Sequence, residues 1–471
     1  MNVTDALRRF RIGRSWTVAD RAAGGALADE GRTATPAPTV ANLVPVVLSG
    51  GGRTGSTAIM SMLGTDPRVA FDREYPFESR YLLYFVKFAL LCRRPDLFQF
   101  LTPEQLFDFD YIGFGGPLPS NYAFNGNAEN SLPQLPLDEF VKELWALFSK
   151  HVSRAHPEFE FHAEKAPSWL SPIVRQFMPC YTIYNVRDPR DIFISANAFM
   201  KKRNYMGFAR VAEDTDVDHA RHIALAFINT FENYYADRKR DDSMLLRYED
   251  FVLRRDKVAK ELHRLCGIVP KTKSGFEFFS IHRTAKDLEH SVDRWKSDPI
   301  PEQVVLFLER SLRDEMRELG YTISQPRQHP CPAVSFRNGD MDLSSLACSS
   351  DGSLETAGEY ATVKIRGVDF WIILPLESFE ASQTKEVWVS VQGEIGDVFS
   401  LYWHGPNSEF AEQRCMTQSY TPSAHWTVLS FPVYRHPEWQ GKIVKLRLDL
   451  FNAVRGPHNG SGKIRWMRLI G

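Results

Sequence analysis

The sequence predicts an α/β domain, a parallel sheet with helices on both faces, followed by an all-β sandwich or jelly roll. Two observations predict the first part. Short apolar runs alternate with helical patterns up to about residue 325, and glycine-rich or charged turns follow several of these runs. The third observation is a change of pattern. In residues 341–471, short runs of alternating apolar and polar residues are separated by turn residues, as in β-sandwiches.

Composition restricts the class of protein. A chain of 471 residues favours two domains, and 43% hydrophobic and 24% charged residues are ordinary for a globular protein. The net charge of −1 argues against nucleic acid or an anionic membrane as a partner. No apolar run approaches the ~20 residues of a membrane span, and the N-terminus lacks the apolar core of a signal peptide. The six scattered cysteines include no C-x-x-C pair, which favours a reducing compartment and a cytoplasmic location.

Four segments follow from the same patterns. Residues 1–42 start with several arginines and become rich in Ala, Gly, Thr and Pro, so we expect a flexible basic leader and linker. Residues 43–325 carry the α/β pattern. A Pro-containing stretch at 326–340 marks a linker, and residues 341–471 form the predicted β-sandwich.

The first predicted strand leads into the most informative loop of the chain. Val44–Leu48 is an apolar run, and the residues that follow read S-G-G-G-R-T-G-S-T before a helical pattern begins. A strand, a glycine-rich turn and a helix N-terminus together form an anion site. Gly50 and Gly55 have the spacing of a nucleoside-triphosphate P-loop, but the Lys of that motif is missing. Arg53 lies inside the loop instead, and its guanidinium can hold two phosphate or sulfate oxygens.

Cations follow two further strands. A predicted strand before residue 164 ends in E-K-A-P, which contains Lys165, and the strand Tyr181–Val186 ends at Arg187. Because the carboxyl ends of parallel strands meet at one edge of a sheet, we expect Arg53, Lys165 and Arg187 to lie on the same edge. Such a cluster suits an anionic ligand.

These motifs together resemble the sulfotransferase family, over about residues 43–322. R-T-G-S-T-A-I-M-S-M-L, from Arg53, is similar to the family's 5′-phosphosulfate loop in its Arg form. V-R-D-P-R-D-I-F-I-S-A is similar to its 3′-phosphate motif, with Arg187 and Ser195 eight residues apart. Weaker matches are E-K-A-P, where Ala stands at the family's hydroxyl position, L-R-Y-E-D around Tyr248, and S-V-D-R-W-K around Arg294.

The resemblance implies a donor, 3′-phosphoadenosine 5′-phosphosulfate, and no metal. It also implies the residues that bind this donor: Gly52, Arg53, Thr54, Gly55, Ser56, Thr57, Arg187, Ser195, Tyr248 and Arg294. Sulfuryl transfer, by analogy with phosphoryl transfer, needs in-line attack and neutralisation of the leaving oxygen. Lys165 and Arg53 can supply that positive charge.

The acceptor hydroxyl needs a base, for which three residues are candidates. Glu74 lies 21 residues after Arg53, the spacing of the base in the tyrosylprotein branch that this loop resembles, so we assign the base to Glu74. Glu78, one helical turn later, is the second candidate. His162 is the third, although a histidine near a strand end is more often structural.

The resulting function is transfer of a sulfuryl group to a hydroxyl of a glycan, a glycolipid or another small acceptor. Two alternatives stay open: a P-loop kinase-like nucleotide enzyme, and a non-catalytic glycan-binding protein. The oligomeric state is left open. Six tryptophans of the β-sandwich can either stack on sugars or fill its core: Trp371, Trp388, Trp403, Trp426, Trp439 and Trp466.

Overall fold

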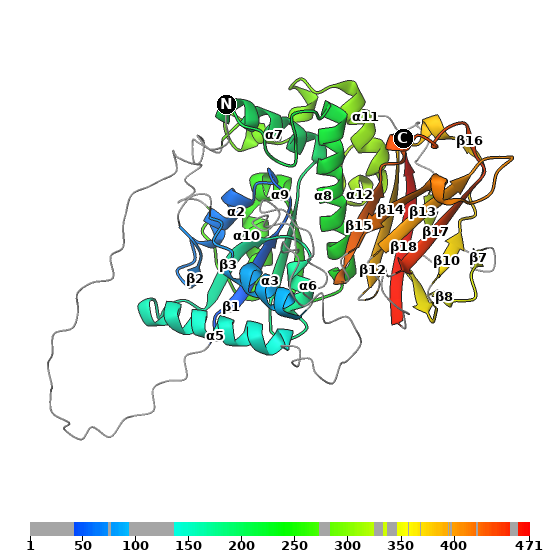
Figure 1. Ribbon diagram of the computed structural model, residues 1–471. Helices are drawn as coiled ribbons and strands as arrows, with labels where there is room; N and C mark the ends of the chain where they lie inside the picture. Colours follow the sequence, from blue (N-terminus) through cyan, green and yellow to red (C-terminus); the bar gives the residue numbers. More distant parts are fainter. Residues whose placement is uncertain are drawn as a thin grey trace, which may run out of the picture. The chain divides into compact units, whose positions relative to one another are not determined.

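The computed structural model describes residues 42–73, 77–93, 136–272, 283–324, 333–336 and 346–471, the last range without residues 357, 368, 394, 396–397, 421–422 and 453–459. Its first part is built on a five-stranded parallel sheet of order β2-β3-β1-β4-β5, which confirms the predicted α/β class (Figure 1). The strands are β1 (Val44–Ser49), β2 (Val69–Ala70), β3 (Phe161–Ala166), β4 (Tyr181–Val186) and β5 (Ser243–Arg247).

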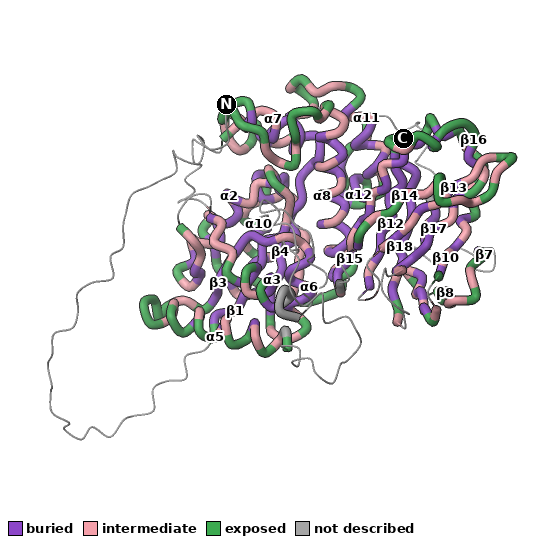
Figure 2. Tube along the Cα trace, viewed as in Figure 1, coloured by how far each residue is buried: buried purple, intermediate pink, exposed green. Residues whose placement is uncertain are grey.

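Helices bury both faces of this sheet, as a parallel sheet requires. Alternation along β1 sends Val46 and Leu48 into the core of one face and Val47 into the core of the other. The first face is covered by α2 (Ser56–Leu63) and α10 (Arg255–Cys266), and the second by α3 (Tyr81–Arg93), α5 (Leu137–Ala155) and α6 (Leu170–Val174). Figure 2 shows the strands as almost continuously buried.

Two helices that shape the site have clear start signals. In α7 (Pro189–Arg203), Pro occupies the first turn and the Asp188 carboxylate accepts from the Arg190 backbone N–H. In α8 (Asp216–Asp237), Thr215 and Asp218 form a capping box. The remaining described helices of this part are α9 (Tyr248–Leu253), α11 (Glu302–Ser311) and α12 (Arg313–Glu318), with 3₁₀ turns at Glu289–Ser291 and Arg294–Lys296.

Two details differ from the sequence-based expectation. The strand predicted before residue 164 continues through Lys165 to Ala166, because β3 pairs with β1 over its whole length. The helical pattern of residues 301–318 forms two helices rather than one, because Leu312 leaves helical geometry and lies fully buried.

The C-terminal part consists of antiparallel sheets that pack as a sandwich, which confirms the predicted β class. One sheet has the order β14-β13-β17-β10-β7; the other has the order β15-β12-β18-β9-β8, with β6 paired to β18. The strands are β6 (Ala333–Ser335), β7 (Ala347–Cys348), β8 (Gly352–Thr356), β9 (Ala361–Ile365), β10 (Trp371–Ile373), β11 (Phe379–Glu380), β12 (Glu386–Gly393), β13 (Val398–His404), β14 (Cys415–Ser419), β15 (Ser423–Phe431), β16 (Lys442–Ile443), β17 (Lys445–Asn452) and β18 (Gly460–Ile470).

Most of the six tryptophans of the C-terminal part are buried, Trp403 and Trp439 in the sandwich core and Trp388 and Trp466 against the α/β part. Trp388, Trp403, Trp426, Trp439 and Trp466 are buried, so they form core rather than surface. Trp371 is half-buried on the outer face of one sheet, where the Arg447 guanidinium lies 5.2 Å from its ring centroid. Of the six, Trp371 is therefore the residue whose ring can meet a ligand on that face.

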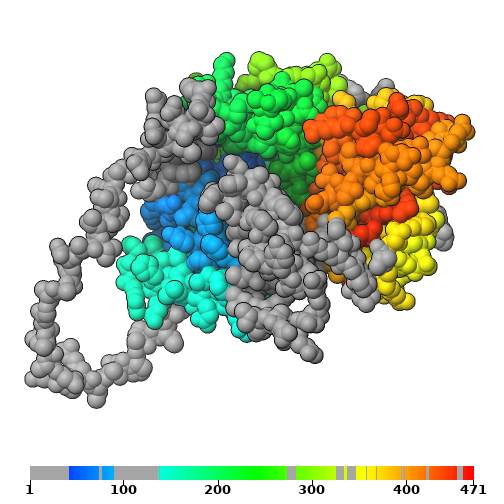
Figure 3. Space-filling model, in the orientation of Figure 1, coloured from blue at the N-terminus to red at the C-terminus, as the bar shows by residue number. Residues whose placement is uncertain are grey.

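The α/β part and the sandwich share buried contacts. One apolar cluster joins residues of α7, α8, α11 and α12 to Trp388, Val428 and Trp466 of the sandwich. In Figure 3 the orange and red strands lie against the green helices. Strand β6, inside the predicted linker, pairs with β18. None of the described helices is long and apolar enough to span a membrane.

Candidate active site

The loop after β1 has the backbone geometry of a close ligand approach. Gly55 and Arg53 adopt positive φ angles of 88° and 66°. A Cβ at Gly55 would lie 2.2 Å from the Tyr248 ring, and one at Gly50 would lie 2.6 Å from the Asn185 carbonyl oxygen. Only glycine fits at these two positions. A non-glycine residue such as Arg53 costs ~1 kcal/mol or more in this conformation, which is typical of functional loops.

Asn185, the penultimate residue of β4, anchors this loop. Its side-chain amide donates to the Thr54 carbonyl oxygen at 3.0 Å and to Thr54 Oγ1 at 2.9 Å. Thr54 Oγ1 donates in turn to the Gly51 carbonyl oxygen at 2.8 Å. Asn185 was not among the predicted site residues, although a lone amide in a buried strand is the signal that could have identified it.

The two main sequence motifs meet in space. Arg53 Nε donates to Ser195 Oγ at 3.2 Å, and Arg187 Nη1 donates to the Arg53 carbonyl oxygen at 2.9 Å. The Arg187 guanidinium also stacks on the Tyr248 ring, 4.6 Å from its centroid. Four predicted binding residues from three separate segments therefore lie side by side.

A hydroxyl bridge connects a fifth predicted residue to this group. Ser195 Oγ and Thr284 Oγ1 are 3.2 Å apart, and Arg294 Nη1 donates to Thr284 Oγ1 at 3.2 Å. Ser291 plays a similar part, since its carbonyl oxygen accepts from Arg187 at 2.5 Å and its hydroxyl lies 2.8 Å from the Tyr248 hydroxyl. Neither Thr284 nor Ser291 was among the predicted site residues: Thr284 lies outside every motif, and Ser291 only opens the S-V-D-R-W-K segment.

Arg187 is a buried cation close to the Asp191 carboxylate. It is 3% exposed, and it donates to two backbone carbonyls rather than to a carboxylate among the described residues. Its Nε has no hydrogen-bond partner in the described part of the chain. A buried guanidinium in this state is stabilised by an anion, so the residues present fit a phosphate group.

Asp188 and Arg190, also in the second motif, serve the fold instead. Arg190 is fully buried, pairs with Asp188 at 2.6 Å and with Glu309, and lies 3.5 Å from the Trp295 ring centroid. The Asp188 backbone N–H donates to Glu249 Oε1 at 2.9 Å. These contacts fix the start of α7 and hence the position of Arg187.

Lys165 lies on the floor of a second part of the site, a cavity of about 530 Å³. Its Nζ donates to Thr57 Oγ1 at 2.9 Å and lies 3.4 Å from Glu78 Oε1, while Arg80 pairs with the other Glu78 oxygen at 3.5 Å. The lining includes Gly50–Gly52, Thr54 and Ser56. Burial lowers the pKa of Lys165 to about 8, against the opposing effect of Glu78.

The three candidate bases have different surroundings. Glu74 lies outside the described residues. Glu78 lines the cavity of Lys165. His162 is 3% exposed on β3, and its ring packs 5.0 Å from the Phe148 ring and 5.6 Å from the Trp145 ring. It does not belong to the described lining of that cavity.

No group of three or more His, Cys, Asp or Glu residues in the described ranges could hold a metal ion. In the same ranges Cys180, Cys266, Cys348 and Cys415 are free thiols.

Comparison with known proteins found one family. Residues 45–270 match the model of the sulfotransferase family. No match was found among curated protein sequences. Solved structures similar to this chain include the sulfotransferase domain of the curacin biosynthetic pathway, with 14% identity over 60% of this chain and 99% of that one and a TM-score of 0.35. The sulfotransferase domain of the Synechococcus PCC 7002 olefin synthase has 18% identity over 60% of this chain and 95% of its own, with a TM-score of 0.34. A xylan-binding module from Roseburia intestinalis is similar over 30% of this chain and 95% of its own (15%, TM-score 0.22).

Proposed function

We propose that the donor of this sulfotransferase-family domain, residues 45–270, is 3′-phosphoadenosine 5′-phosphosulfate. We further propose that its acceptor is a hydroxyl of a glycan, a glycolipid or another small molecule. The observation that carries the donor proposal is the contact of Arg53 with Ser195 and Arg187, which joins the two phosphate motifs.

Each motif has a part in holding the donor. The loop Gly52–Thr57, with its backbone N–H groups at the start of α2, holds the 5′-phosphosulfate. Arg187 and Ser195 hold the 3′-phosphate, supported by Tyr248 and Arg294. The 3′-phosphate distinguishes this donor from an ordinary adenylate.

When bound, the donor supplies an activated sulfuryl group. The acceptor oxygen forms a bond to sulfur, the bond between sulfur and the bridging phosphate oxygen breaks, and the acceptor proton passes to a carboxylate. The products are a sulfate ester and adenosine 3′,5′-bisphosphate. Lys165 and Arg53 neutralise the charge that develops on the bridging oxygen.

Two carboxylates compete for the role of base. We assign the base to Glu74 because of its spacing to Arg53. Glu78 is favoured by its place in the cavity of Lys165, 3.4 Å from the ammonium nitrogen.

Beyond the matched domain, we propose a linker at residues 326–340 and a sandwich domain at residues 341–471, as the sequence patterns indicate. A carbohydrate-binding role of the sandwich is supported by the half-buried Trp371 and its neighbour Arg447. We propose a cytoplasmic location on the scattered cysteines alone.

The test is incubation of the purified protein with the donor and a set of candidate alcohols, followed by mass spectrometry. We expect one acceptor to gain the mass of one SO₃ group while adenosine 3′,5′-bisphosphate forms in equal amount, with or without a chelator. Phosphate transfer from ATP that requires magnesium would instead identify the kinase-like alternative.

A further inference from the structure

A second cavity, of about 380 Å³, lies where the sandwich meets the α/β part. We propose that this cavity is the acceptor site, that β15 forms one of its walls, and that it takes an uncharged alcohol with a ring. The inference rests on the proposed function. It assigns a part in substrate selection to the C-terminal region, beyond binding of glycans at a distance.

The two cavities meet at the glycine-rich loop. Gly50, Gly51, Ala226 and Thr230 line both of them. A hydroxyl at the inner end of the second cavity therefore faces the loop that is proposed to hold the 5′-phosphosulfate, next to the cavity of Lys165. An acceptor oxygen there would lie beside the donor's sulfuryl group.

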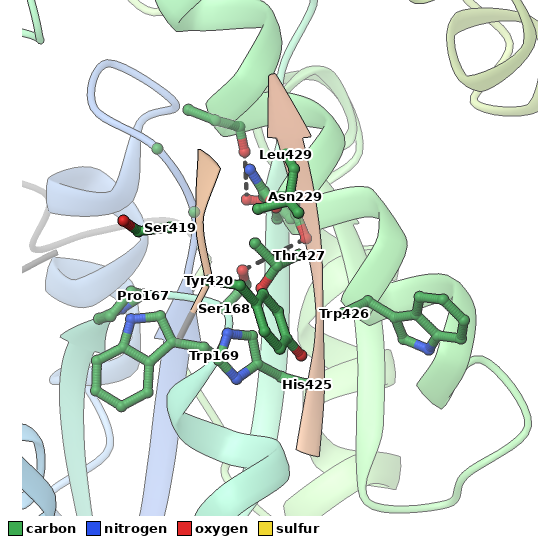
Figure 4. A pocket seen from close by; sticks show the side chains of 14 residues that line it. Pro167, Ser168, Trp169, Asn229, Ser419, Tyr420, His425, Trp426, Thr427 and Leu429 are labelled. Carbon is green, nitrogen blue, oxygen red and sulfur yellow. Dashed lines mark hydrogen bonds between the residues drawn. The ribbon is translucent and has the colours of Figure 1, made fainter. Parts of the chain in front are cut away.

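The wall from the sandwich follows from strand geometry. Side chains alternate along β15, so His425, Thr427 and Leu429 project to one side, and all three line the cavity. Figure 4 shows the Trp426 ring on the opposite side of the strand, away from Tyr420 and His425. The facing wall comes from Pro167–Trp169, directly after β3.

The walls are held together before any ligand binds. β15 is an edge strand, and the Asn233 side-chain amide pairs with both the N–H and the C=O of Trp426, at 3.1 and 3.0 Å. One turn earlier in α8, Asn229 Oδ1 accepts from the Val428 N–H at 2.8 Å. Asn233 also donates to the Ser168 hydroxyl at 3.3 Å. A helix therefore completes the hydrogen bonds of the edge strand and fixes the width of the cavity.

The chemistry of the lining identifies the class of acceptor. No Asp, Glu, Lys or Arg lines this cavity in the described part of the chain. Burial lowers the pKa of His425 to about 3, so its ring is neutral at physiological pH. An ionised acceptor would lose its hydration without a countercharge. Aromatic residues (Trp169 and Tyr420) and hydroxyls (Ser168, Ser419 and Thr427) suit an uncharged ring that bears hydroxyl groups.

Two probes of nearly equal size test this assignment: phenyl β-D-glucopyranoside, which is neutral, and phenyl β-D-glucuronide, which carries a carboxylate. Calorimetry on the full chain saturated with adenosine 3′,5′-bisphosphate measures their affinities. We expect the glucoside to bind at least about tenfold more tightly. This ratio corresponds to ~1.4 kcal/mol for the lost hydration of the glucuronide carboxylate, which has no countercharge in the described lining of the cavity.

Variants locate the site. Thr427→Trp and Ser419→Trp, on two strands, should each fill the cavity and weaken glucoside binding about tenfold or more. Thr356→Trp is the matched control, since Thr356 is exposed on β8, at the opposite edge of the sheet from β15. All three should bind the bisphosphate as the wild type does, which also shows that they fold.

Three results would overturn the acceptor assignment: tighter binding of the glucuronide, binding of neither glycoside by the wild type, or glucoside binding that survives both cavity-filling variants. A wild type that fails to bind the bisphosphate would refute the proposed donor instead, so the two failures are distinguishable.

Discussion

At the scale of the residue, the two arginines of the second motif differ in the groups that they contact. Arg190 is neutralised by two carboxylates and serves the fold, whereas Arg187, three residues earlier, donates only to carbonyl oxygens in the described part of the chain. The difference follows from Asp188, which lies between the two arginines: it caps α7 and its carboxylate binds Arg190. Arg187 is thereby left for an anion.

Lys165 gives the first prediction, a pH dependence. Burial lowers its pKa to about 8, so in the free enzyme the ammonium loses its proton as the pH rises through about 8. The protonated form neutralises the leaving oxygen, so kcat/KM for the donor should be constant below this pH and fall above it. A pH profile of initial rates measures the effect.

Lys165→Arg is the matched control, because a guanidinium stays protonated over the whole range. Its rate will be lower, but its profile should lack the fall near pH 8. Profiles of the same shape for both proteins would show that another group titrates.

The base gives the second prediction. Glu74→Gln should lower turnover roughly 10²–10⁴-fold, the usual contribution of a general base, with little change in affinity for the bisphosphate. Glu78→Gln should cost far less and His162→Ala less still. The opposite order for Glu74 and Glu78 would move the base to Glu78, which lies beside Lys165.

Motif spacing could predict Arg53, Arg187 and Ser195, because these residue types at that spacing have few other uses. It could not predict Thr284, whose hydroxyl bridge another polar residue could supply, nor the role of Ser291 in the S-V-D-R-W-K segment, whose carbonyl oxygen any residue could supply. It also gave no sign that His162 would be surrounded by aromatic rings of α3 and α5.

At the scale of the element, α8 connects the two parts of the chain. One side packs near β4, and the other meets β15 and β18. Glu232 is fully buried and accepts from Arg465 Nη1 at 2.5 Å, from Trp466 Nε1 at 2.9 Å and from Ser390 Oγ at 2.9 Å. In the sequence, Glu232 resembles any charged residue on the solvent face of a helix, so this role could not be predicted.

Glu232 gives the third prediction. Glu232→Ala removes the buried carboxylate of the ion pair with Arg465, so the free energy of unfolding should fall by about 3–5 kcal/mol. Urea denaturation measures it. Glu355→Ala, which breaks the exposed 2.7 Å pair with Lys364, is the control and should cost less than about 1 kcal/mol. Similar losses in the two variants would mean that the Glu232 contacts do not stabilise the fold.

The alternation that predicts the sandwich is clearest where it continues over five or more residues, as in β9, β13 and β15. The strands β7 and β11 have two residues each and are defined by their pairing partners. Two residues are too few to show an alternation of apolar and polar side chains. The same applies to β6, which the sequence places in a linker.

At the scale of the whole molecule, the change of pattern near residue 326 predicts a boundary, yet buried groups join the two sides. Besides Glu232 and Arg465, Glu315 of α12 is fully buried and pairs with Arg468 of β18 at 2.7 Å. Apolar residues of α8 and α11 share a cluster with Trp388 and Trp466. Sequence periodicity describes each element alone and cannot reveal such pairs.

The shared contacts give the fourth prediction. A fragment of residues 1–326 exposes that apolar cluster and leaves Glu232 and Glu315 without their partners, so we expect aggregation or loss of a cooperative melting transition. Co-expression with residues 327–471 should restore a folded complex. A monomeric fragment that melts as cooperatively as the full chain would contradict this expectation.

The fifth and most direct test of the account is calorimetric titration of the full-length protein, in the presence of EDTA, with adenosine 3′,5′-bisphosphate and with 5′-AMP. We predict that the bisphosphate binds more tightly by ~1.5–3 kcal/mol, the value of a hydrogen bond to a charged group, and that Arg187→Ala removes most of this difference. Equal affinities for the two nucleotides in the wild type would contradict the assignment of Arg187 and Ser195 to a 3′-phosphate, and with it the proposed donor.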